Sequence, residues 1–238
     1  MPAALRALRG ADGAGAALPR TVPGGDRVSG RPGRALSWPP RSDDDYRREA
    51  AAGLGEAALA AFARVRLIVL DCDGVLTDGR LYYDAQGEAF KSFDARDGLG
   101  LVLARAGGLQ LALLTGRDSP AAARRAADLR FHAVKLGRFD KQRALREILD
   151  ELAVDPADVL YMGDDLVDVP ALALVGAPVA VPGAPADVRD RCLHVTAAPG
   201  GAGAVREVCE RVLGLQGRFG PALVKVAARA WLPTGEDA

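Results

Sequence analysis

Two aspartates that directly follow a short apolar run are the first residues of this sequence that could do chemistry. Asp71 and Asp73 belong to the stretch D-C-D-G-V-L-T-D over residues 71–78, which comes after R-L-I-V-L. On a loop opened by Gly74, one carboxylate can attack an electrophile while the other protonates a leaving group. Asp and Gly are also common in turns and helix caps, so this pair alone is weak evidence for an active site.

Further candidates come later in the chain. Thr115 stands in L-L-T-G-R and Lys141 in F-D-K, where a helix cap and a solvated lysine are equally good interpretations of each residue alone. The stretch G-D-D-L-V-D over residues 163–168 supplies three acids, of which a helix cap explains only one. Acids crowded at one place repel each other unless a divalent cation or a lysine is present. The three acids of this stretch are Asp164, Asp165 and Asp168.

The elements that must position these residues are apolar runs that alternate with helical patterns. Alternation of this kind predicts βαβ units and an α/β fold with a doubly wound, Rossmann-like parallel sheet. Ligands of such sheets bind outside the carboxyl ends of the strands, where Asp71, Thr115 and Asp164 are expected. The predicted strand and helix pairs are 109–115 with 119–129, 133–134 with 140–152, 159–162 with 166–174, and 178–181 with 187–191, after a first strand over 66–71.

Two segments fall outside this alternation. Ser42 and the acids after it predict the start of a helix that runs to about residue 65. Residues 80–93 place β-forming residues on both sides of D-A-Q-G, a hairpin turn with Gly87 at the position that needs a positive φ. An isolated hairpin is marginally stable in water, so it must pack on its own domain or on a neighbouring subunit.

Composition excludes some classes of partner. Lys plus Arg and Asp plus Glu both number 31, so no excess of positive charge favours nucleic acid or an anionic membrane. No apolar run reaches the ~18 residues that a membrane span needs. Three cysteines without C-x-x-C spacing favour a reducing, cytoplasmic setting and structural roles. We therefore expect a protein with neither a nucleic-acid nor a membrane partner.

The chain is expected to hold a domain over residues 42–214, an N-terminal extension over 1–41 and a C-terminal tail over 215–238. The extension is rich in Ala, Gly, Pro and Arg and contains only two acids, so we expect disorder or a start codon placed too early. An Arg-rich, acid-poor start is also typical of transit peptides, although the prolines and glycines would break an amphipathic helix.

The order D-x-D-G-x-x-x-D, L-L-T-G-R, a lone Lys and G-D-D-x-x-D resembles the four motifs of the haloacid dehalogenase superfamily. The wording D-G-V-L-T-D-G-R, F-D-A-R-D-G-L-G and P-G-G-A-G-A-V-R-E is similar, more narrowly, to its capless sugar phosphatases that hydrolyse 3-deoxy-D-manno-octulosonate 8-phosphate. The resemblance covers residues 60 to 214. It implies a Mg²⁺-dependent phosphatase without a cap domain, a cytoplasmic homotetramer joined through hairpins, and a role in lipopolysaccharide biosynthesis.

The resemblance also implies a role for each motif residue. Asp71 would be the nucleophile that forms an aspartyl-phosphate, and Asp73 the general acid and base. Thr115 and Lys141 would hold the phosphoryl oxygens. Mg²⁺ would be bound by the Asp71 carboxylate, the Asp73 backbone carbonyl and Asp164, with Asp165 and Asp168 as supporting acids. For the carboxylate of a keto-acid sugar, the candidate cations are Lys91, Arg96 and Arg117, each of which could equally be a solvated charge.

Other interpretations stay open at this point. A phosphatase for a nine-carbon keto acid 9-phosphate, or for a broader set of sugar phosphates, would carry the same motifs. A signalling receiver domain also combines acids, Thr and Lys around Mg²⁺, but it lacks an acid two residues after its phosphoacceptor, as Asp73 is here. A catalytically idle oligomerisation domain has no physical need for clustered, repelling acids.

Overall fold

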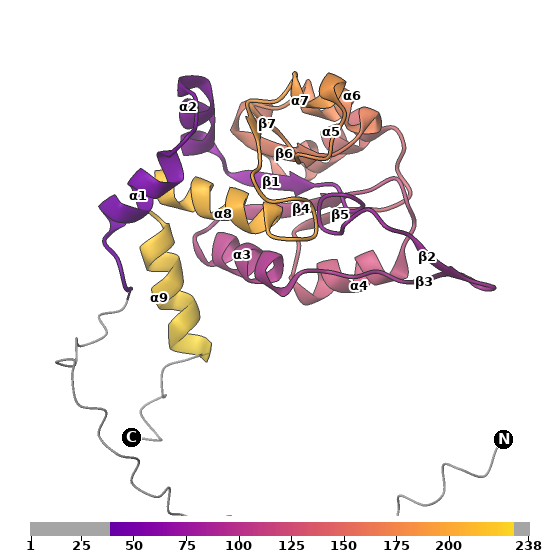
Figure 1. The fold of residues 1–238 in the computed structure, drawn as a ribbon, viewed down its shortest axis with the longest axis horizontal. Helices are drawn as coiled ribbons and strands as arrows, with labels where there is room; N and C mark the ends of the chain where they lie inside the picture. Colours follow the sequence, from indigo (N-terminus) through magenta and orange to yellow (C-terminus); the bar gives the residue numbers. More distant parts are fainter. Residues whose placement is uncertain (1–38, 231–238) are drawn as a thin grey trace, which may run out of the picture. The chain divides into compact units, whose positions relative to one another are not determined.

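A six-stranded parallel sheet forms the centre of the computed structural model, which describes residues 39–230 (Figure 1). The strand order is β5-β4-β1-β6-β7-β8. Helices α3, α4 and α8 lie on one side of the sheet and α5, α6 and α7 on the other. The predicted doubly wound α/β fold is therefore confirmed. The strands are β1 Leu67–Leu70, β4 Gln110–Leu114, β5 Ala133–Lys135, β6 Val159–Gly163, β7 Ala177–Ala180 and β8 His194–Val195.

Helices occupy the connections between these strands. Bundles of buried Leu, Val and Ala from the helices and the sheet form one continuous core. The helices are α1 Asp43–Ala51, α2 Glu56–Arg64, α3 Ala95–Ala106, α4 Pro120–Asp128, α5 Lys141–Leu152, α6 Val169–Leu172, α7 Ala186–Arg189, α8 Ala204–Leu215 and α9 Phe219–Ala230, with short 3₁₀ turns at Pro156–Asp158 and Leu166–Asp168.

Strand β1 fixes the place of the first acidic motif. All four of its residues are fully buried, as expected for a central strand covered by helices on both faces. Leu70 pairs with Leu113 of β4 and with Met162 of β6, so these three strands end at the same level. The chain segments that follow them therefore start side by side at one edge of the sheet.

The hairpin consists of β2 Tyr82–Asp84 and β3 Gly87–Phe90, paired antiparallel. Gly87 has a φ of 122°, which confirms the prediction that this turn needs glycine. Between β1 and α3, and between β4 and α5, the structure holds only this hairpin and one α4–β5 unit respectively. Within residues 39–230 there is accordingly no cap domain.

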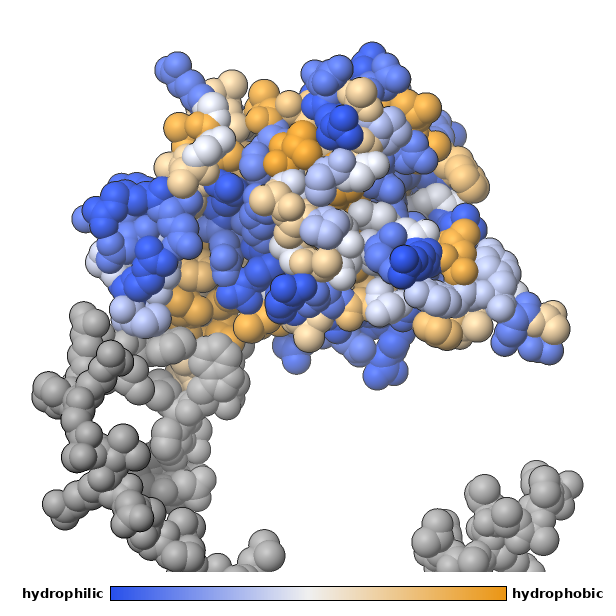
Figure 2. Space-filling view, in the orientation of Figure 1, coloured by the Kyte–Doolittle hydropathy of each residue, from blue (hydrophilic) through white to orange (hydrophobic). Residues whose placement is uncertain are grey.

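The expected single helix from residue 42 to about residue 65 is wrong, because two helices replace it. Ser42 and Asp45 form a capping box at the start of α1, as the Ser-Asp pattern predicts. The helix then ends before Gly53, whose φ of 73° is outside the helical region, and α2 begins after Gly55. Figure 2 shows a strongly hydrophilic surface over α1, in keeping with its exposed acids and arginines.

The last described helix, α9, packs against α3 and α1. Residues 1–38 of the expected N-terminal extension, and residues 231–238 of the expected tail, lie outside the described residues. None of the helices within residues 39–230 is long and apolar enough to cross a membrane.

Candidate active site

A cavity of about 320 Å³ opens at the edge of the sheet where β1, β4 and β6 end. It brings together residues from all four predicted motifs, which lie between Asp71 and Val167 in the chain. Lys91, Arg96 and Asp168 are the predicted site residues that do not line it. The lining residues are Asp71, Asp73, Gly79, Thr115, Gly116, Arg117, Phe139, Lys141, Asp164, Asp165 and Val167.

Asp71, Asp164 and Asp168 form a tight cluster of carboxylates. Oxygen atoms of the three side chains lie within 4.8 Å of one another. Burial raises the pKa of Asp71 to about 6, Lys141 opposes the rise, and Asp168 adds to it. Burial raises the pKa of Asp164 to about 8, with further contributions from Asp71 and Asp168. The cluster thus holds more negative charge than its protein surroundings neutralise.

Lys141 is the cation that the structure places among these acids. Its side chain is 2% exposed, and Nζ lies 3.0 Å from Asp71 Oδ1 and 2.5 Å from Asp168 Oδ1. Burial alone would lower the pKa of Lys141, but the two carboxylates outweigh burial and raise it, so the ammonium group stays charged. Asp140 caps the helix that begins at Lys141, because its side chain accepts a hydrogen bond from the Arg143 amide.

Asp168 is a supporting residue whose carboxylate accepts hydrogen bonds from neighbouring groups of the site. Its Oδ1 accepts a hydrogen bond from Tyr161 at 2.7 Å, and its Oδ2 accepts from the backbone amides of Asp164 and Asp165. With both oxygens engaged, the carboxylate fixes Lys141 and the loop after β6. The sequence analysis missed Tyr161, although a tyrosine inside a fully buried strand signals a hydroxyl that needs a polar partner.

Asp165 and Asp164 differ in their surroundings although they are neighbours. Asp165 is exposed, and its Oδ1 accepts a hydrogen bond from the Leu166 amide at the start of a 3₁₀ turn. Asp164 is partly buried and packs so closely on Gly74 that a Cβ at that glycine would lie 1.9 Å from Asp164 Oδ2. Gly74, with a φ of 86°, therefore permits the first and last acidic motifs to touch.

Thr115 lies at the end of β4 and is 2% exposed. Its Oγ1 accepts a hydrogen bond from the Arg117 amide at 3.3 Å, which leaves the hydroxyl proton available to a ligand in the cavity. Arg117 extends over the cavity with 44% of its side chain exposed, and its Nε lies 3.4 Å from Asp73 Oδ2. A hydroxyl donor and an exposed guanidinium group are suited to bind phosphate and carboxylate oxygens.

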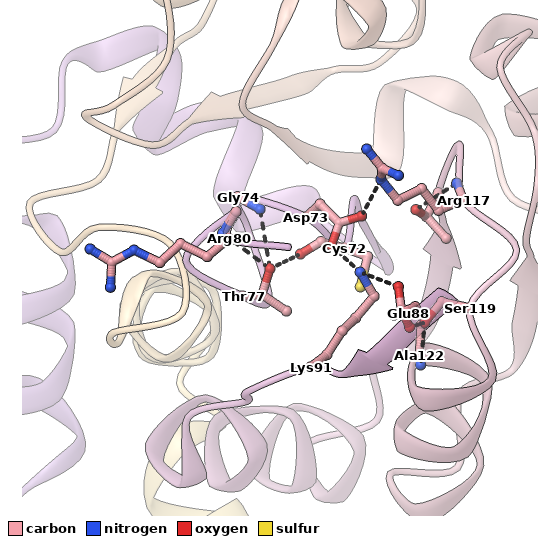
Figure 3. A network of polar contacts seen from close by, with 12 residues as sticks. Cys72, Asp73, Gly74, Thr77, Arg80, Glu88, Lys91, Arg117, Ser119 and Ala122 are labelled. Carbon is pink, nitrogen blue, oxygen red and sulfur yellow. Dashed lines mark hydrogen bonds and ion pairs between the residues drawn. The ribbon is translucent and has the colours of Figure 1, made fainter. Parts of the chain in front are cut away.

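Asp73 is held by a polar network that reaches the hairpin (Figure 3). Lys91 Nζ contacts Asp73 Oδ1 and lies 3.1 Å from Glu88 Oε2. Ser119, the N-cap residue of α4, donates its hydroxyl to Glu88. Lys91 is 2% exposed, so the structure places this predicted substrate-binding residue behind Asp73 rather than in the cavity. Glu88 was not singled out from the sequence, where it is one charge within the predicted hairpin.

Arg96 lies elsewhere. It pairs with Asp94 at 2.6 Å and donates to the carbonyl of Ala202 at 2.9 Å. Its side chain lines a separate cavity of about 620 Å³ between α1, α8 and α9. The structure therefore does not bring Arg96 together with the other predicted site residues.

A glycine-rich loop over residues 199–203 supports the first acidic motif. A Cβ at Gly200 would lie 1.7 Å from the carbonyl oxygen of Gly74, so only glycine allows this backbone contact. The buried carboxylate of Asp97 anchors the loop, because it accepts hydrogen bonds from the amides of Gly203 and Arg206. Asp97 was also missed in the sequence, where nothing near this residue signals hydrogen bonds to amides 106 and 109 positions away.

The remaining singled-out residues have structural surroundings. Cys72 is fully buried, and burial raises the pKa of its thiol to about 12. His132 accepts a hydrogen bond from the Leu111 amide, and His194 lies 3.0 Å from Glu207. Neither histidine belongs to the acidic cluster in the described part of the chain.

The acidic cluster fits a divalent cation. Asp71 Oδ1 is buried, and no donor among the described residues is aligned with it as a hydrogen bond, although Lys141 is close enough for an ion pair. Hard carboxylate oxygens are the ligands that Mg²⁺ prefers. Because Asp168 has both oxygens engaged, Asp71 and Asp164 are the side chains best placed to bind such an ion.

Comparison with known proteins places these motifs in context. A family model described as haloacid dehalogenase-like hydrolase matches residues 93–176. The 3-deoxy-D-manno-octulosonate 8-phosphate phosphatase KdsC of Haemophilus influenzae is 44% identical over 154 residues, which are 65% of this chain and 86% of that protein. The KdsC phosphatase of Escherichia coli K12 is 40% identical over 161 residues, or 68% of this chain and 86% of that protein.

Solved structures give the same picture. The 3-deoxy-D-manno-octulosonate 8-phosphate phosphatase of Moraxella catarrhalis, in complex with a magnesium ion, a phosphate ion and a KDO molecule, matches with a TM-score of 0.66 at 36% identity. That match covers 68% of this chain and 93% of the other. The cobalt-bound Haemophilus influenzae phosphatase matches with a TM-score of 0.66 at 42% identity over 67% of this chain and 93% of the other.

Proposed function

Because this chain belongs to the haloacid dehalogenase-like phosphatases of the KdsC type, we propose that it hydrolyses 3-deoxy-D-manno-octulosonate 8-phosphate in a Mg²⁺-dependent reaction. One observation carries the proposal. The carboxylate of Asp71 lies in a cavity between the buried Lys141 and the partly buried Asp164, with a hydroxyl and an arginine facing the same space.

We assign the chemical steps to the residues of this cavity. Asp71 attacks phosphorus while the bond from phosphorus to the sugar oxygen breaks, and Asp73 gives its proton to that departing oxygen. Asp73 then takes a proton from a water molecule, which attacks the aspartyl-phosphate, releases phosphate and restores Asp71. Thr115 and Lys141 hold the phosphoryl oxygens in line during both steps.

Asp71, Asp164 and the backbone carbonyl of Asp73 would hold Mg²⁺. The ion supplies charge neutralisation that lets an anionic carboxylate approach an anionic phosphate. Asp165, exposed at the rim, and Asp168, buried behind Lys141, support this arrangement without binding the ion.

Arg117 is the best placed of the three candidate cations for the carboxylate of a keto-acid sugar. It is exposed and faces the cavity, whereas Lys91 is buried against Asp73 and Arg96 lines a different cavity. A guanidinium group also binds a carboxylate in a bidentate manner. A nine-carbon keto acid 9-phosphate carries the same carboxylate, so measured specificity has to separate the two substrates.

A substrate panel tests the proposal. We expect 3-deoxy-D-manno-octulosonate 8-phosphate to give a kcat/KM at least about tenfold above nine-carbon keto acid 9-phosphates and simple hexose phosphates. Removal of the metal with EDTA should abolish phosphate release, and added Mg²⁺ should restore it. Turnover that persists in EDTA would contradict the metal assignment, and equal kcat/KM values across the panel would contradict the substrate assignment.

The hairpin supports a homotetramer. Its exposed apolar side chains, Leu81, Tyr83 and Phe90, are 41%, 61% and 55% exposed, and Tyr82 stacks on Phe90. Apolar side chains gathered on a projecting hairpin are typical of a subunit contact.

Three free cysteines fit a reducing compartment, and we place the enzyme in the cytoplasm on that ground.

Light scattering at low protein concentration checks the subunit contact. We expect a tetramer for the natural chain and smaller species for the double variant Tyr83→Ser, Phe90→Ser, because the variant removes apolar contact area. Val224→Ser, an exposed apolar position on α9, is the matched control that should leave the mass unchanged. A natural chain that scatters as a monomer would end the hairpin argument.

A further inference from the structure

We propose that Lys91 and Glu88 are positioning residues that fix the proposed acid and base Asp73, so that the hairpin sets the geometry of proton transfer. The inference rests on the proposed function of Asp73. It assigns Lys91 to the enzyme's own carboxylate and withdraws it from the carboxylate of the substrate.

The burial of Lys91 is the first observation behind this inference. Only 2% of its side chain is exposed, and its ammonium group is shared between Asp73 and Glu88. A buried ammonium group with two carboxylate partners is neutralised where it stands. Moving it to a ligand would take the ammonium group away from Glu88 and from Oδ1 of Asp73, so contact with the substrate is disfavoured.

The second observation is that the two oxygens of Asp73 have different partners. Oδ1 contacts the buried Lys91, while Oδ2 lies 3.4 Å from the half-exposed Arg117. Figure 3 shows both cations converging on this one carboxylate. With Oδ1 held by Lys91, Oδ2 is the oxygen that remains to carry the proton toward the cavity. Lys91 therefore determines which oxygen does the proton transfer.

Glu88 connects the pair formed by Lys91 and Asp73 to the second motif, L-L-T-G-R over residues 113–117. It accepts a hydrogen bond from Ser119, and Ser119 also caps α4, the helix that begins just after Thr115 and Arg117. A single carboxylate thus joins the hairpin, the lysine and the loop after β4. Movement of the hairpin would displace Lys91 and, through it, the side chain of Asp73.

Leaving groups of different basicity test the inference. A sugar alkoxide needs a proton to depart, whereas nitrophenolate departs from p-nitrophenyl phosphate without one. In Lys91→Met we expect kcat for the sugar phosphate to fall about tenfold to a hundredfold, with KM changed less than about twofold. The first-turnover burst of nitrophenolate should fall by less than about threefold.

Three further variants complete the design. Glu88→Gln should give the same pattern at about a third to a tenth of the natural rate, and it replaces Lys91→Met if that variant fails to fold. When Asp73→Asn is already present, adding Lys91→Met should cause no further loss of kcat for the sugar phosphate, because the side chain that Lys91 positions is no longer an acid. Lys225→Met removes a lysine that bonds the Ala106 carbonyl on α3 and should leave both rates unchanged.

The outcomes separate this inference from the proposed function. If the natural enzyme hydrolyses neither compound, the proposed function fails. If the natural enzyme is active and Lys91→Met raises KM with kcat unchanged, Lys91 contacts the substrate and the inference is overturned. Equal losses with both leaving groups would also overturn it, since they indicate general disruption of the site.

Discussion

The acidic cluster around Asp71 and the single acid Glu207 lie in opposite electrostatic surroundings. Asp71 and Asp164 have each other and Asp168 as neighbours, and burial together with like charge raises the pKa of Asp164 to about 8. Glu207, on α8, accepts hydrogen bonds from Arg211 and from the Ala197 and Ala198 amides and lies 3.0 Å from His194. Burial alone would raise the pKa of Glu207, but these partners outweigh burial and lower it to about 2.

The comparison separates acids to which we assign chemistry from an acid that stabilises the fold. Crowded, ionised carboxylates raise the free energy of the metal-free fold, and a cation or a phosphate partner relieves the cost only when it binds. A carboxylate that is saturated with donors lowers the free energy of the fold at all times. The surroundings of an acid, more than its burial, therefore indicate what it does.

Asp71→Asn is the strongest test of the difference between the crowded acids and Glu207. An amide cannot attack phosphorus, so we expect turnover to fall by about four orders of magnitude or more. The same change removes a repelling charge, so the metal-free protein should become more stable at pH 8. Phosphate release and urea denaturation measure the two effects on the same preparation.

The pH dependence gives the control for that stability change. Asp71 has a folded pKa of about 6, above its unfolded value of 3.8, so its ionised form costs stability above pH 6 and costs none below pH 3.8. The gain from Asp71→Asn should therefore be present at pH 8 and absent near pH 3.5. Activity near that of the natural enzyme would end the nucleophile assignment, and a loss of stability at pH 8 would end the account of the crowded acids.

The crowded cluster could be predicted from the sequence, because each acid follows a strand. A run of Leu, Ile and Val marks β1, and the parallel register of β1 with β4 and β6 brings Asp71, Thr115 and Asp164 to one edge. The hairpin turn was equally readable, since Gly87 is the residue that tolerates a positive φ. Local chemistry determines these features.

Pairings between distant side chains could not be predicted in the same way. Nothing in the local sequence distinguishes a lysine that meets a substrate from one that meets Asp73, 18 residues away. The donors around Glu207 come from β8, the loop after it and the next turn of α8, so its saturation appears only in three dimensions. The break between α1 and α2 falls at Gly53 and Gly55, which the expected single helix ran across because only its start at Ser42 carried a clear signal.

Glu207→Gln tests the same difference at the stabilising acid, and its expected effect is smaller. The variant keeps the shape of the side chain but loses the charge that Arg211 neutralises and that the Ala197 and Ala198 amides contact. We expect the free energy of unfolding at pH 7 to fall by about 2 kcal/mol, with kcat unchanged within about twofold. Urea denaturation and phosphate release measure the two quantities.

The pH window of this effect distinguishes it from a packing defect. The folded pKa of Glu207, about 2, is below its unfolded value of 4.5, so the stabilisation is complete above pH 4.5 and is lost as the pH falls through 2. The natural chain and Glu207→Gln should thus differ most at neutral pH and converge near pH 2. Glu151→Gln, which alters an exposed pair with Lys135, is the matched control and should change stability much less. A difference that stayed constant from pH 7 to pH 2 would mean that Glu207 stabilises the fold through packing and not through its charge, and the contrast with the acidic cluster around Asp71 would then disappear.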